Sequence, residues 1–380
     1  MQKIDINFNW PYVTGKEIEY ILQAHANGKL SGDGSFTNLC QKWLESQTAS
    51  YKALLTHSCT GALEMAALLL NIEPGDEIIL PSYTFVSTAN AFVLRGAVPV
   101  FVDIREDTLN IDETLVESVI TSKTRAIVAV HYAGVACEMD TLIDIGKKHN
   151  LFVVEDAAQG VMASYKGRAL GSIGHLGAYS FHETKNIISG EGGALLVNDL
   201  RFEKLAEIIR EKGTDRSKFF RGEIDKYTWQ HLGSSYLPSE IIAAFLWAQL
   251  QEAQKITDQR LKIWGSYNSL MAPLEENDFI RRPIIPIDCK HNAHMYYILL
   301  KNKNVRNKVS QYLKNKGINA VSHYIPLHSS PAGKFYSKKN SNLKITDDLS
   351  DRILRMPMWI GLTEDQIQEI TNVIKKAIVS

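Results

Sequence analysis

The sequence predicts an α/β fold: a mostly parallel sheet with helices on both faces, followed by a smaller α+β C-terminal domain. Runs of Val, Ile and Leu that lack polar alternation indicate strands buried on both faces, as in parallel sheets. Amphipathic stretches separate these runs, which is typical of repeated strand–helix units. Strands are expected at 77–80, 99–104, 125–132, 151–156, 178–181 and 193–198, and helices at 60–71, 86–95, 113–120, 139–149 and 202–212.

The pattern changes after about residue 238. A long helical stretch, 239–271, leads away from the sheet, and the remaining chain alternates apolar runs at 295–300 and 318–324 with helices around 305–316 and 363–378. For 380 residues, at roughly 150 per domain, we expect a large domain over 1–250 and a small domain over 251–380. Ligands of such open sheets bind at the carboxyl ends of the strands, so functional side chains are expected directly after each strand.

Composition and charge narrow the classes of function. Lysine plus arginine and aspartate plus glutamate both number 42, so the formal net charge is zero. Binding to a nucleic acid needs a basic surplus, which is missing here. The cysteines form no CxxC pair and have no histidine at zinc-ligand spacing, so we expect reduced thiols and no metal site. They are Cys40, Cys59, Cys137 and Cys289.

The N-terminal residues lack a charged segment followed by an apolar one, and therefore do not resemble a signal peptide. No apolar run approaches the ~18 residues of a membrane span. We therefore expect a soluble, cytoplasmic protein with no nucleic-acid and no membrane partner.

A possible anion site begins at Ser58. A Ser/Thr-rich turn, 58–60, leads into an amphipathic helix, whose first amides lack intrahelical partners and carry about half a positive charge. The hydroxyl of Thr60 adds a donor, so this helix start is able to hold a phosphate. The alternative is that Ser58 or Thr60 only caps the helix.

An aromatic residue, Phe85, follows the strand at 77–80. At a strand's carboxyl end it is placed to stack on a flat heterocycle, worth about 0.5–1.5 kcal/mol beyond the area that it buries. The alternative is ordinary packing in the core.

Two acids, Glu155 and Asp156, end the strand at 151–156. Side chains alternate between the faces of a strand, so only one of the two points into the crevice. Opposite a protonated pyridine nitrogen, at ~4 Å and an effective dielectric constant of 20, such a carboxylate contributes about 4 kcal/mol. This pairing keeps the ring nitrogen protonated, so that the ring is able to withdraw electrons. A helix cap or a structural ion pair is the alternative.

A lysine, Lys185, lies in an apolar-flanked loop between the strands at 178–181 and 193–198. Long charged side chains are mostly exposed, so a covalent role explains this position: an amine with a lowered pKa forms a Schiff base with an aldehyde. Ser180, five residues earlier, is a further candidate phosphate donor. The alternative is a surface lysine that extends its amine into water. Together, the phosphate site, ring platform, counter-charge and lysine predict a pyridoxal 5'-phosphate site.

The motifs SCTGALEMAALLL, PSYTFVSTANAF, VVEDAAQG, SFHETKN and GEGGA resemble those of the DegT/DnrJ/EryC1/StrS sugar aminotransferases. The resemblance runs essentially from end to end. It implies a pyridoxal-phosphate-dependent transferase of fold type I with a seven-stranded sheet, and a homodimer with active sites at the interface. The segments KLSGDGSFT, HYAGVACEMD, GSSYLPSE, NAHMYYI and HYIPLH narrow it to members that aminate C4 of dTDP-4-keto-6-deoxyglucose. The implied donor is L-glutamate, and the products are dTDP-4-amino-4,6-dideoxygalactose, for enterobacterial common antigen, and 2-oxoglutarate.

The resemblance also implies residue roles. Lys185 would bond to the cofactor and then serve as acid and base, and Asp156 would pair with the ring nitrogen. The other implied cofactor contacts are Gln159 at the ring hydroxyl, Phe85 on the ring face, and Thr60, Gly61 and Ser180 at the phosphate. The residues expected near the sugar are His323, Tyr324 and His328, for which packing in the small domain is the alternative.

One segment departs from the family pattern. Many relatives carry Asn-Tyr-Arg where this chain has Ser234-Ser235-Tyr236-Leu237. Ser235 retains a hydrogen-bond donor for the partner subunit's phosphate, with a shorter reach. Other functions to weigh are a C3 aminotransferase, a C4 aminotransferase of gluco configuration, a dehydratase on the same scaffold and a non-catalytic nucleotide-sugar sensor. Dehydratase relatives have His at the position of Lys185. For a general metabolic aminotransferase, no arginine motif for a second substrate carboxylate is recognisable.

Overall fold

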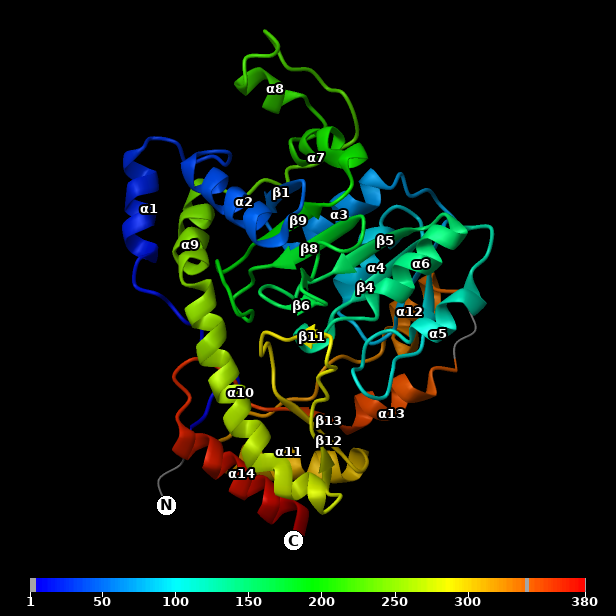
Figure 1. The fold of residues 1–380 in the computed structure, drawn as a ribbon, viewed down its shortest axis with the longest axis vertical. Helices are drawn as coiled ribbons and strands as arrows, with labels where there is room; N and C mark the ends of the chain where they lie inside the picture. The colour runs from blue at the N-terminus through cyan, green and yellow to red at the C-terminus, as the bar shows by residue number, and fades with distance from the viewer. Residues whose placement is uncertain (1–4, 339–341, 380) are drawn as a thin grey trace.

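The computed structural model describes residues 5–338 and 342–379 and confirms the α/β fold with a mostly parallel central sheet (Figure 1). The sheet strands are β1 (Lys52–Thr56), β2 (Glu77–Pro81), β3 (Val98–Val102), β4 (Thr124–Val130), β5 (Phe152–Asp156), β8 (Leu176–Ser180) and β9 (Gly193–Val197). Their order is β1-β9-β8-β5-β4-β2-β3. Six of these strands run in one direction, and β9 runs the opposite way, antiparallel to its neighbours β1 and β8.

The predicted strands agree with the observed ones, but β1 was missed. Its sequence, KALLT, offers only three strongly apolar residues. Its strand character comes from pairing along its whole length with β9, a partner about 140 residues away in the chain.

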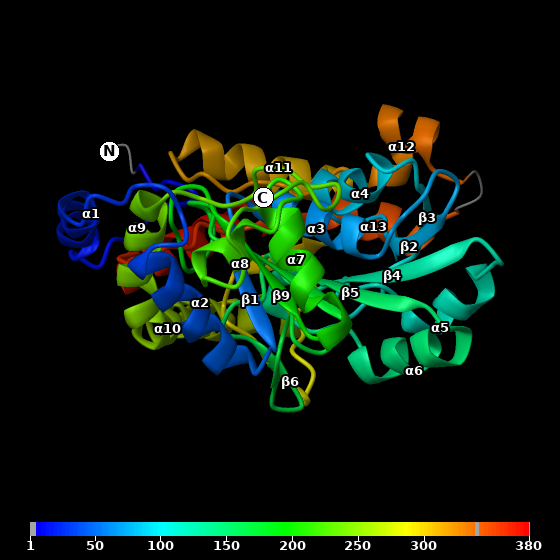
Figure 2. The ribbon, with the colours of Figure 1, turned by 90° about the horizontal axis from the view of Figure 1, so that it is seen from above.

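Helices cover both faces of the sheet (Figure 2). One face carries α3 (Cys59–Leu69), α4 (Val86–Val93) and α7 (Glu203–Arg210), and the other carries α2 (Ser35–Thr48), α6 (Met139–His149) and α9 (Glu240–Gln251). Successive strand residues enter different cores: Val153 packs with α6, and Val154 packs with α3. This is the alternation that a strand imposes. The short α5 (Glu113–Val116) and its 3-10 extension replace the helix expected at 113–120.

The C-terminal part is a smaller α+β unit. Its antiparallel sheet consists of β10 (Ile280–Arg281), β12 (Tyr297–Leu300) and β13 (Ile353–Arg355). The helices packed around it include α10 (Ala253–Glu276), α11 (Lys303–Asn315), α13 (Lys344–Arg352) and α14 (Glu364–Val379). The apolar run at 318–324 makes only isolated bridges, one of them between Ile318 and Ile6. The domain boundary at residue 250 stays a prediction.

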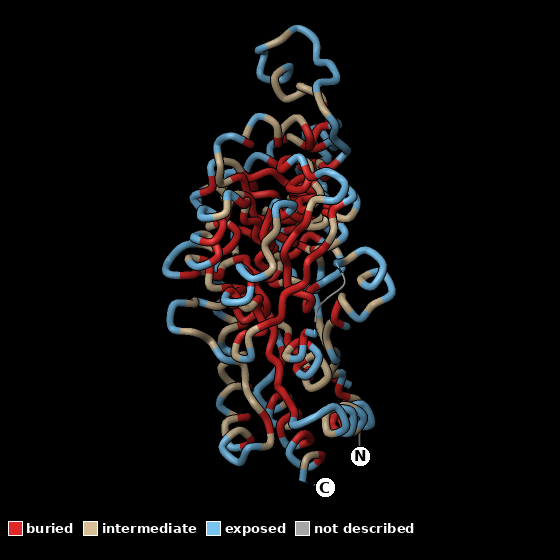
Figure 3. The backbone as a smooth tube through the Cα atoms, turned by 90° about the vertical axis from the view of Figure 1, so that its right-hand side faces the viewer, coloured by how far each residue is buried: buried red, intermediate tan, exposed pale blue. Residues whose placement is uncertain are grey.

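A segment over 213–235 projects from the body and contains α8 (Arg216–Phe220) (Figure 1). The buried chain is concentrated in the body, whereas this projection is largely exposed (Figure 3). Further helices are α1 (Glu17–Ala26) and α12 (Pro331–Tyr336), and a small sheet joins β6 (Ser164–Tyr165), β7 (Arg168–Ala169) and β11 (Cys289–Lys290). Within the described residues, no helix combines the length and apolarity needed to cross a bilayer.

Candidate active site

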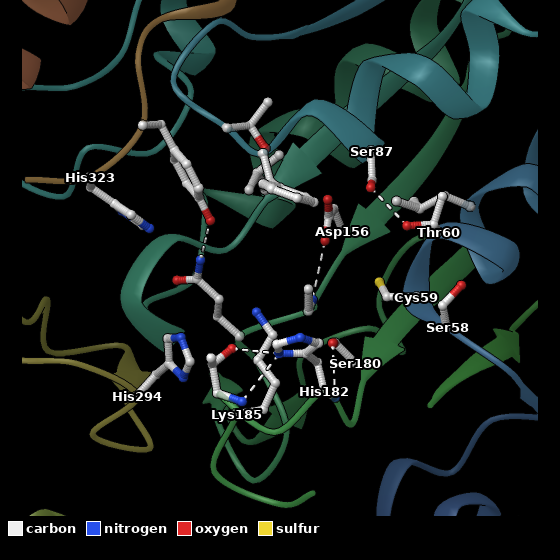
Figure 4. A pocket seen from close by; sticks show the side chains of 18 of the residues that line it. Ser58, Cys59, Thr60, Ser87, Asp156, Ser180, His182, Lys185, His294 and His323 are labelled. Atoms are coloured by element: carbon white, nitrogen blue, oxygen red, sulfur yellow. Dashed lines mark hydrogen bonds between the residues drawn. The ribbon is translucent and has the colours of Figure 1, made fainter. Parts of the chain in front are cut away.

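A cavity of about 470 Å³ opens at the carboxyl ends of β5 and β8 and is closed on one side by the C-terminal unit. The structure brings together most of the predicted site residues in its lining: Thr60, Phe85, Asp156, Gln159, Ser180, Lys185, His323 and Tyr324. In Figure 4, Ser58, Cys59, Thr60 and Ser87 lie on one side of the pocket, and His294 and His323 lie on the other.

The register of β5 separates the two acids that sequence alone left open. Asp156 lines the cavity. Glu155 is fully buried on the opposite side, where it accepts from the Nε2 of His131 at 2.8 Å and from the amide of Gly171 at 2.7 Å. Its other oxygen accepts from the amides of Ile173 and Gly174, each at 2.6 Å. Glu155 is therefore a structural acid, and Asp156 is the acid available to a ligand.

Hydrogen bonds hold the carboxylate of Asp156 in a fixed orientation. The hydroxyl of Thr88 donates to its Oδ2 at 2.6 Å, and the amide of Ala158 donates to its Oδ1 at 3.2 Å. The two donors together fix the direction in which both carboxylate oxygens point. A buried, oriented carboxylate of this kind suits a cationic partner in the cavity.

The start of α3 combines a helix cap with free donors. Ser58 is the cap, since its Oγ accepts from the amide of Gly61 at 3.0 Å. The hydroxyls of Thr60 and Ser87 lie 2.7 Å apart at the cavity wall, and Ser180 is close by in the lining (Figure 4). The two sequence interpretations are thus compatible: Ser58 caps the helix, while Thr60 faces the cavity.

A close approach of the backbone of β9 fixes this helix start. A Cβ atom on Gly193 would lie 2.4 Å from the amide nitrogen of Cys59 and 2.4 Å from the carbonyl carbon of Ser58. Only glycine fits there, because no real Cβ makes such contacts. The glycine-rich turn therefore sets the position of the α3 amides relative to β8.

Lys185 lies in a loop that backbone hydrogen bonds close tightly. The amide of Phe181 donates to the carbonyl of Gly192 at 2.8 Å, and that of Ser189 donates to the carbonyl of Phe181 at 2.7 Å. The loop places the side chain of Lys185 in the cavity (Figure 4). Burial lowers the pKa of its amine, against an opposite effect of Cys59 and Asp156. A lowered pKa increases the neutral, nucleophilic fraction.

Gln159 connects the sheet to the C-terminal unit. Its Oε1 accepts from the amide of Ala133 at 2.6 Å, and its Nε2 donates to the hydroxyl of Tyr324 at 3.1 Å. The ring of Tyr324 stacks on His323 with centroids 3.6 Å apart. Burial lowers the pKa of His323 well below its ordinary value, so this imidazole is neutral at physiological pH.

Phe85 is 55% exposed and therefore does not belong to the core. Its ring contacts that of Tyr324 with centroids 6.2 Å apart. An exposed aromatic ring in the lining of the cavity is available to a flat ligand.

The other predicted site residues lie outside the lining. Gly61 is inside α3, where a side chain would press against His57 and Tyr236 at 3.1 Å. Ser235 is exposed, and its backbone forms an isolated β-bridge with Glu211. His328 bonds with its Nδ1 to Ser82 at 2.7 Å and with its Nε2 to Asp347 at 3.2 Å.

Sequence reasoning missed several lining residues. Ser87 lines the cavity, and Thr88 lies behind it as the donor to Asp156; both are in the first turn of α4, which was the available signal. Phe8, His294 and Arg355 come from distant segments of the chain, and no local pattern distinguishes them. Only the packing of the C-terminal unit against the sheet brings them to the cavity.

The lining fits a phosphorylated aldehyde cofactor. The α3 amides and hydroxyls suit a phosphate, Lys185 suits an aldehyde, and Asp156 suits a ring nitrogen. Each of these groups comes from a different segment, and all face one cavity.

Comparison with known proteins identifies the family. The model of the DegT/DnrJ/EryC1/StrS aminotransferase family matches residues 11–375. GDP-perosamine synthase of Caulobacter vibrioides is 30% identical over 371 residues, which cover 97% of both chains. UDP-N-acetyl-3-dehydro-α-D-glucosamine 3-aminotransferase of Acidithiobacillus ferrooxidans is 30% identical over 357 residues, or 92% of both chains.

Solved structures support the same family assignment. The putative sugar aminotransferase Spr1654 of Streptococcus pneumoniae, in its pyridoxamine-phosphate form, superposes with a TM-score of 0.91 at 25% identity, covering 99% of this chain and 98% of that chain. The same protein is known in a pyridoxal-phosphate form. The chain belongs to the DegT/DnrJ/EryC1/StrS aminotransferase family, whose enzymes depend on pyridoxal phosphate.

Proposed function

We propose that this sugar aminotransferase moves the amino group of L-glutamate to C4 of dTDP-4-keto-6-deoxy-D-glucose. The products would be dTDP-4-amino-4,6-dideoxy-D-galactose, a sugar for a surface polysaccharide, and 2-oxoglutarate. The observation that carries the proposal is that Lys185 and the oriented carboxylate of Asp156 face one cavity beside the α3 amides.

Pyridoxal phosphate supplies an aldehyde that takes up the amino group and a ring that delocalises electrons. Lys185 would hold that aldehyde and, once released, carry the proton off the donor's α-carbon. A single amine serves as base and then as acid most effectively when its pKa is lowered toward the working pH. Burial of Lys185 acts in that direction.

The remaining residues would bind and orient. Asp156, held by Thr88, would keep the ring nitrogen protonated. Thr60, Ser180 and the amides of α3 would hold the phosphate. Gln159 would contact the ring hydroxyl, and Phe85 would cover one face of the ring.

We propose His323 and Tyr324 as the wall that contacts the sugar. The two rings stack on each other, and Tyr324 is tied to the sheet through Gln159. His328 would act at a distance from the cavity by positioning this wall, because it bonds to Ser82, four residues before α4 begins at Val86.

The regiochemistry has a specific alternative. The relative from Acidithiobacillus ferrooxidans is a 3-aminotransferase of a UDP sugar, which favours testing amination at C3. The structure of the product, determined by NMR after incubation with glutamate and dTDP-4-keto-6-deoxyglucose, distinguishes C3 from C4 and the galacto from the gluco product.

The test of the cofactor assignment is K185A. We expect it to lose both the visible absorbance of the lysine-bound cofactor and transamination, because no other lysine of the described residues lines the cavity. The matched control is K166A, which removes an exposed lysine that pairs with Asp140. Normal turnover of K185A would contradict the assignment.

A further inference from the structure

One cation in the cavity wall is left without an anion. Arg355 ends β13 and lines the cavity. No carboxylate of residues 5–338 and 342–379 forms an ion pair with its guanidinium, and its Nε is buried without a hydrogen-bond partner. Burying a charge is costly unless it is paired, so such a group points to an anion that comes from a ligand.

Arg355 is held firmly in this position. Its guanidinium lies over the ring of Phe8, with 4.8 Å from its central carbon to the ring centroid. The carbonyl of Phe8 in turn accepts from the amide of Met358 at 3.2 Å. Backbone bonds between Arg355 and Val321 fix the other side. An arginine oriented in this way loses little freedom when it binds an anion.

The neighbours of Arg355 leave its charge uncompensated. Arg260 is buried but already donates to the carbonyls of Ala293 and His294, at 3.1 and 2.8 Å. Burial lowers the pKa of His294 and of His323, and Arg355 lowers both further, so both rings are neutral. Arg355 is therefore a cation on this wall that is free to bind a ligand.

The geometry points to the α-carboxylate of the amino donor as the anion that Arg355 binds. This inference rests on the proposed function. The donor's α-carbon bears the nitrogen that is transferred, and this nitrogen must reach the position of the Lys185 amine. The carboxylate is attached to the same carbon. Arg355 and Lys185 line the same cavity, and the charge of Arg355 contributes to the lowered pKa of the Lys185 amine. A nucleotide's diphosphate lies beyond the whole sugar ring from C4, too far from the reacting atoms for the same contact.

A guanidinium binds a carboxylate through two parallel hydrogen bonds. The keto sugar carries no carboxylate, so Arg355 would act in only one of the two half-reactions. This asymmetry distinguishes binding of the donor from a general structural role.

The experiment measures the half-reactions separately by the absorbance of the cofactor. Glutamate is added to the pyridoxal form, and the keto sugar is added to the pyridoxamine form. For R355Q we expect kcat/KM for glutamate to fall by roughly 10- to 100-fold, the usual effect of losing a charge-assisted hydrogen bond. The half-reaction with the keto sugar should change by less than about threefold, within ordinary context effects.

Two further readouts separate the roles. Calorimetric titration of 2-oxoglutarate into the pyridoxal form should show binding to the wild type and at least about tenfold weaker binding to R355Q. R355K keeps the charge without the planar fork, so its loss should be smaller than that of R355Q. The matched control, R125Q, removes an exposed arginine that pairs with Asp76 and should leave all these values unchanged.

Equal losses in both half-reactions, or a loss confined to the sugar, would overturn the assignment to the donor. R355K serves if R355Q does not fold, because a folded R355K with wild-type affinity for 2-oxoglutarate would also overturn it. Failure of the wild-type enzyme to react with glutamate at all would instead refute the proposed function.

Discussion

At the scale of single residues, the contrast between Glu155 and Asp156 shows how one step along a strand separates structure from chemistry. Glu155 satisfies three backbone amides and a histidine, whereas Asp156 keeps a face toward the cavity. The network of Glu155 holds the turn at 171–174 against β5.

Replacing this acid tests the structural role. E155Q turns an accepting oxygen into a donor and leaves a buried amide unpaired, which costs about 1–3 kcal/mol. We expect the free energy of unfolding, measured in denaturant on the apoenzyme, to fall by that amount. E19Q, at an exposed glutamate, is the control. An unchanged unfolding midpoint for E155Q would show that the network contributes little.

The lowered pKa of Lys185 predicts a pH dependence. Burial favours the neutral amine, so the reactive form is reached at a lower pH than the ordinary lysine value of 10.5. The rate at which apoenzyme captures pyridoxal phosphate should therefore rise with pH and level off below 10.5. Stopped-flow absorbance measures this rate, and a lysine peptide is the reference. A profile that follows the peptide would contradict the assignment.

At the scale of elements, the contact between β9 and the start of α3 governs the phosphate site. G193A would place a Cβ atom against the backbone of Ser58 and Cys59. The helix start must then move, and we expect affinity for pyridoxal phosphate to fall at least tenfold, since one displaced hydrogen bond to a charged group costs about 1.5–3 kcal/mol.

The matched control is G265A in α10, where an added Cβ meets nothing within 4 Å. Alanine there should stabilise the helix slightly. Fluorescence titration of both apoenzymes with the cofactor compares the two variants. Equal affinity in G193A and wild type would show that the α3 amides do not carry the phosphate.

At the scale of the whole molecule, the projecting segment over 213–235 exposes aromatic and aliphatic side chains: Phe219, Phe220, Tyr227, Trp229 and Leu232. Apolar residues gathered on a projection are typical of a surface that a partner covers. We propose that this partner is a second copy of the chain, as the sequence resemblance implies, and that Ser235 at the base of the projection would approach the partner's phosphate.

A substitution in the projection tests the dimer. Trp229 is 77% exposed, and W229E should weaken self-association by at least about thirtyfold, because a tryptophan that an interface buries often contributes 2 kcal/mol or more. Sedimentation velocity across a dilution series measures the effect. I287S, at an aliphatic residue that is 99% exposed, is the control. Wild-type behaviour of W229E would exclude the projection from the interface.

The sequence by itself determined the fold class, the positions along the chain of most strands, and the segments that bear Lys185, Asp156 and Thr60. These follow from local rules: apolar runs, amphipathic periods, and the position of polar residues directly after strands. The tertiary structure decided what local rules leave open. It selected Asp156 over Glu155 through the register of β5, paired β1 with a distant strand, and brought Phe8, His294 and Arg355 to the cavity. The physical reason is that these contacts join residues far apart in the chain, whose positions depend on packing rather than on their neighbours in sequence.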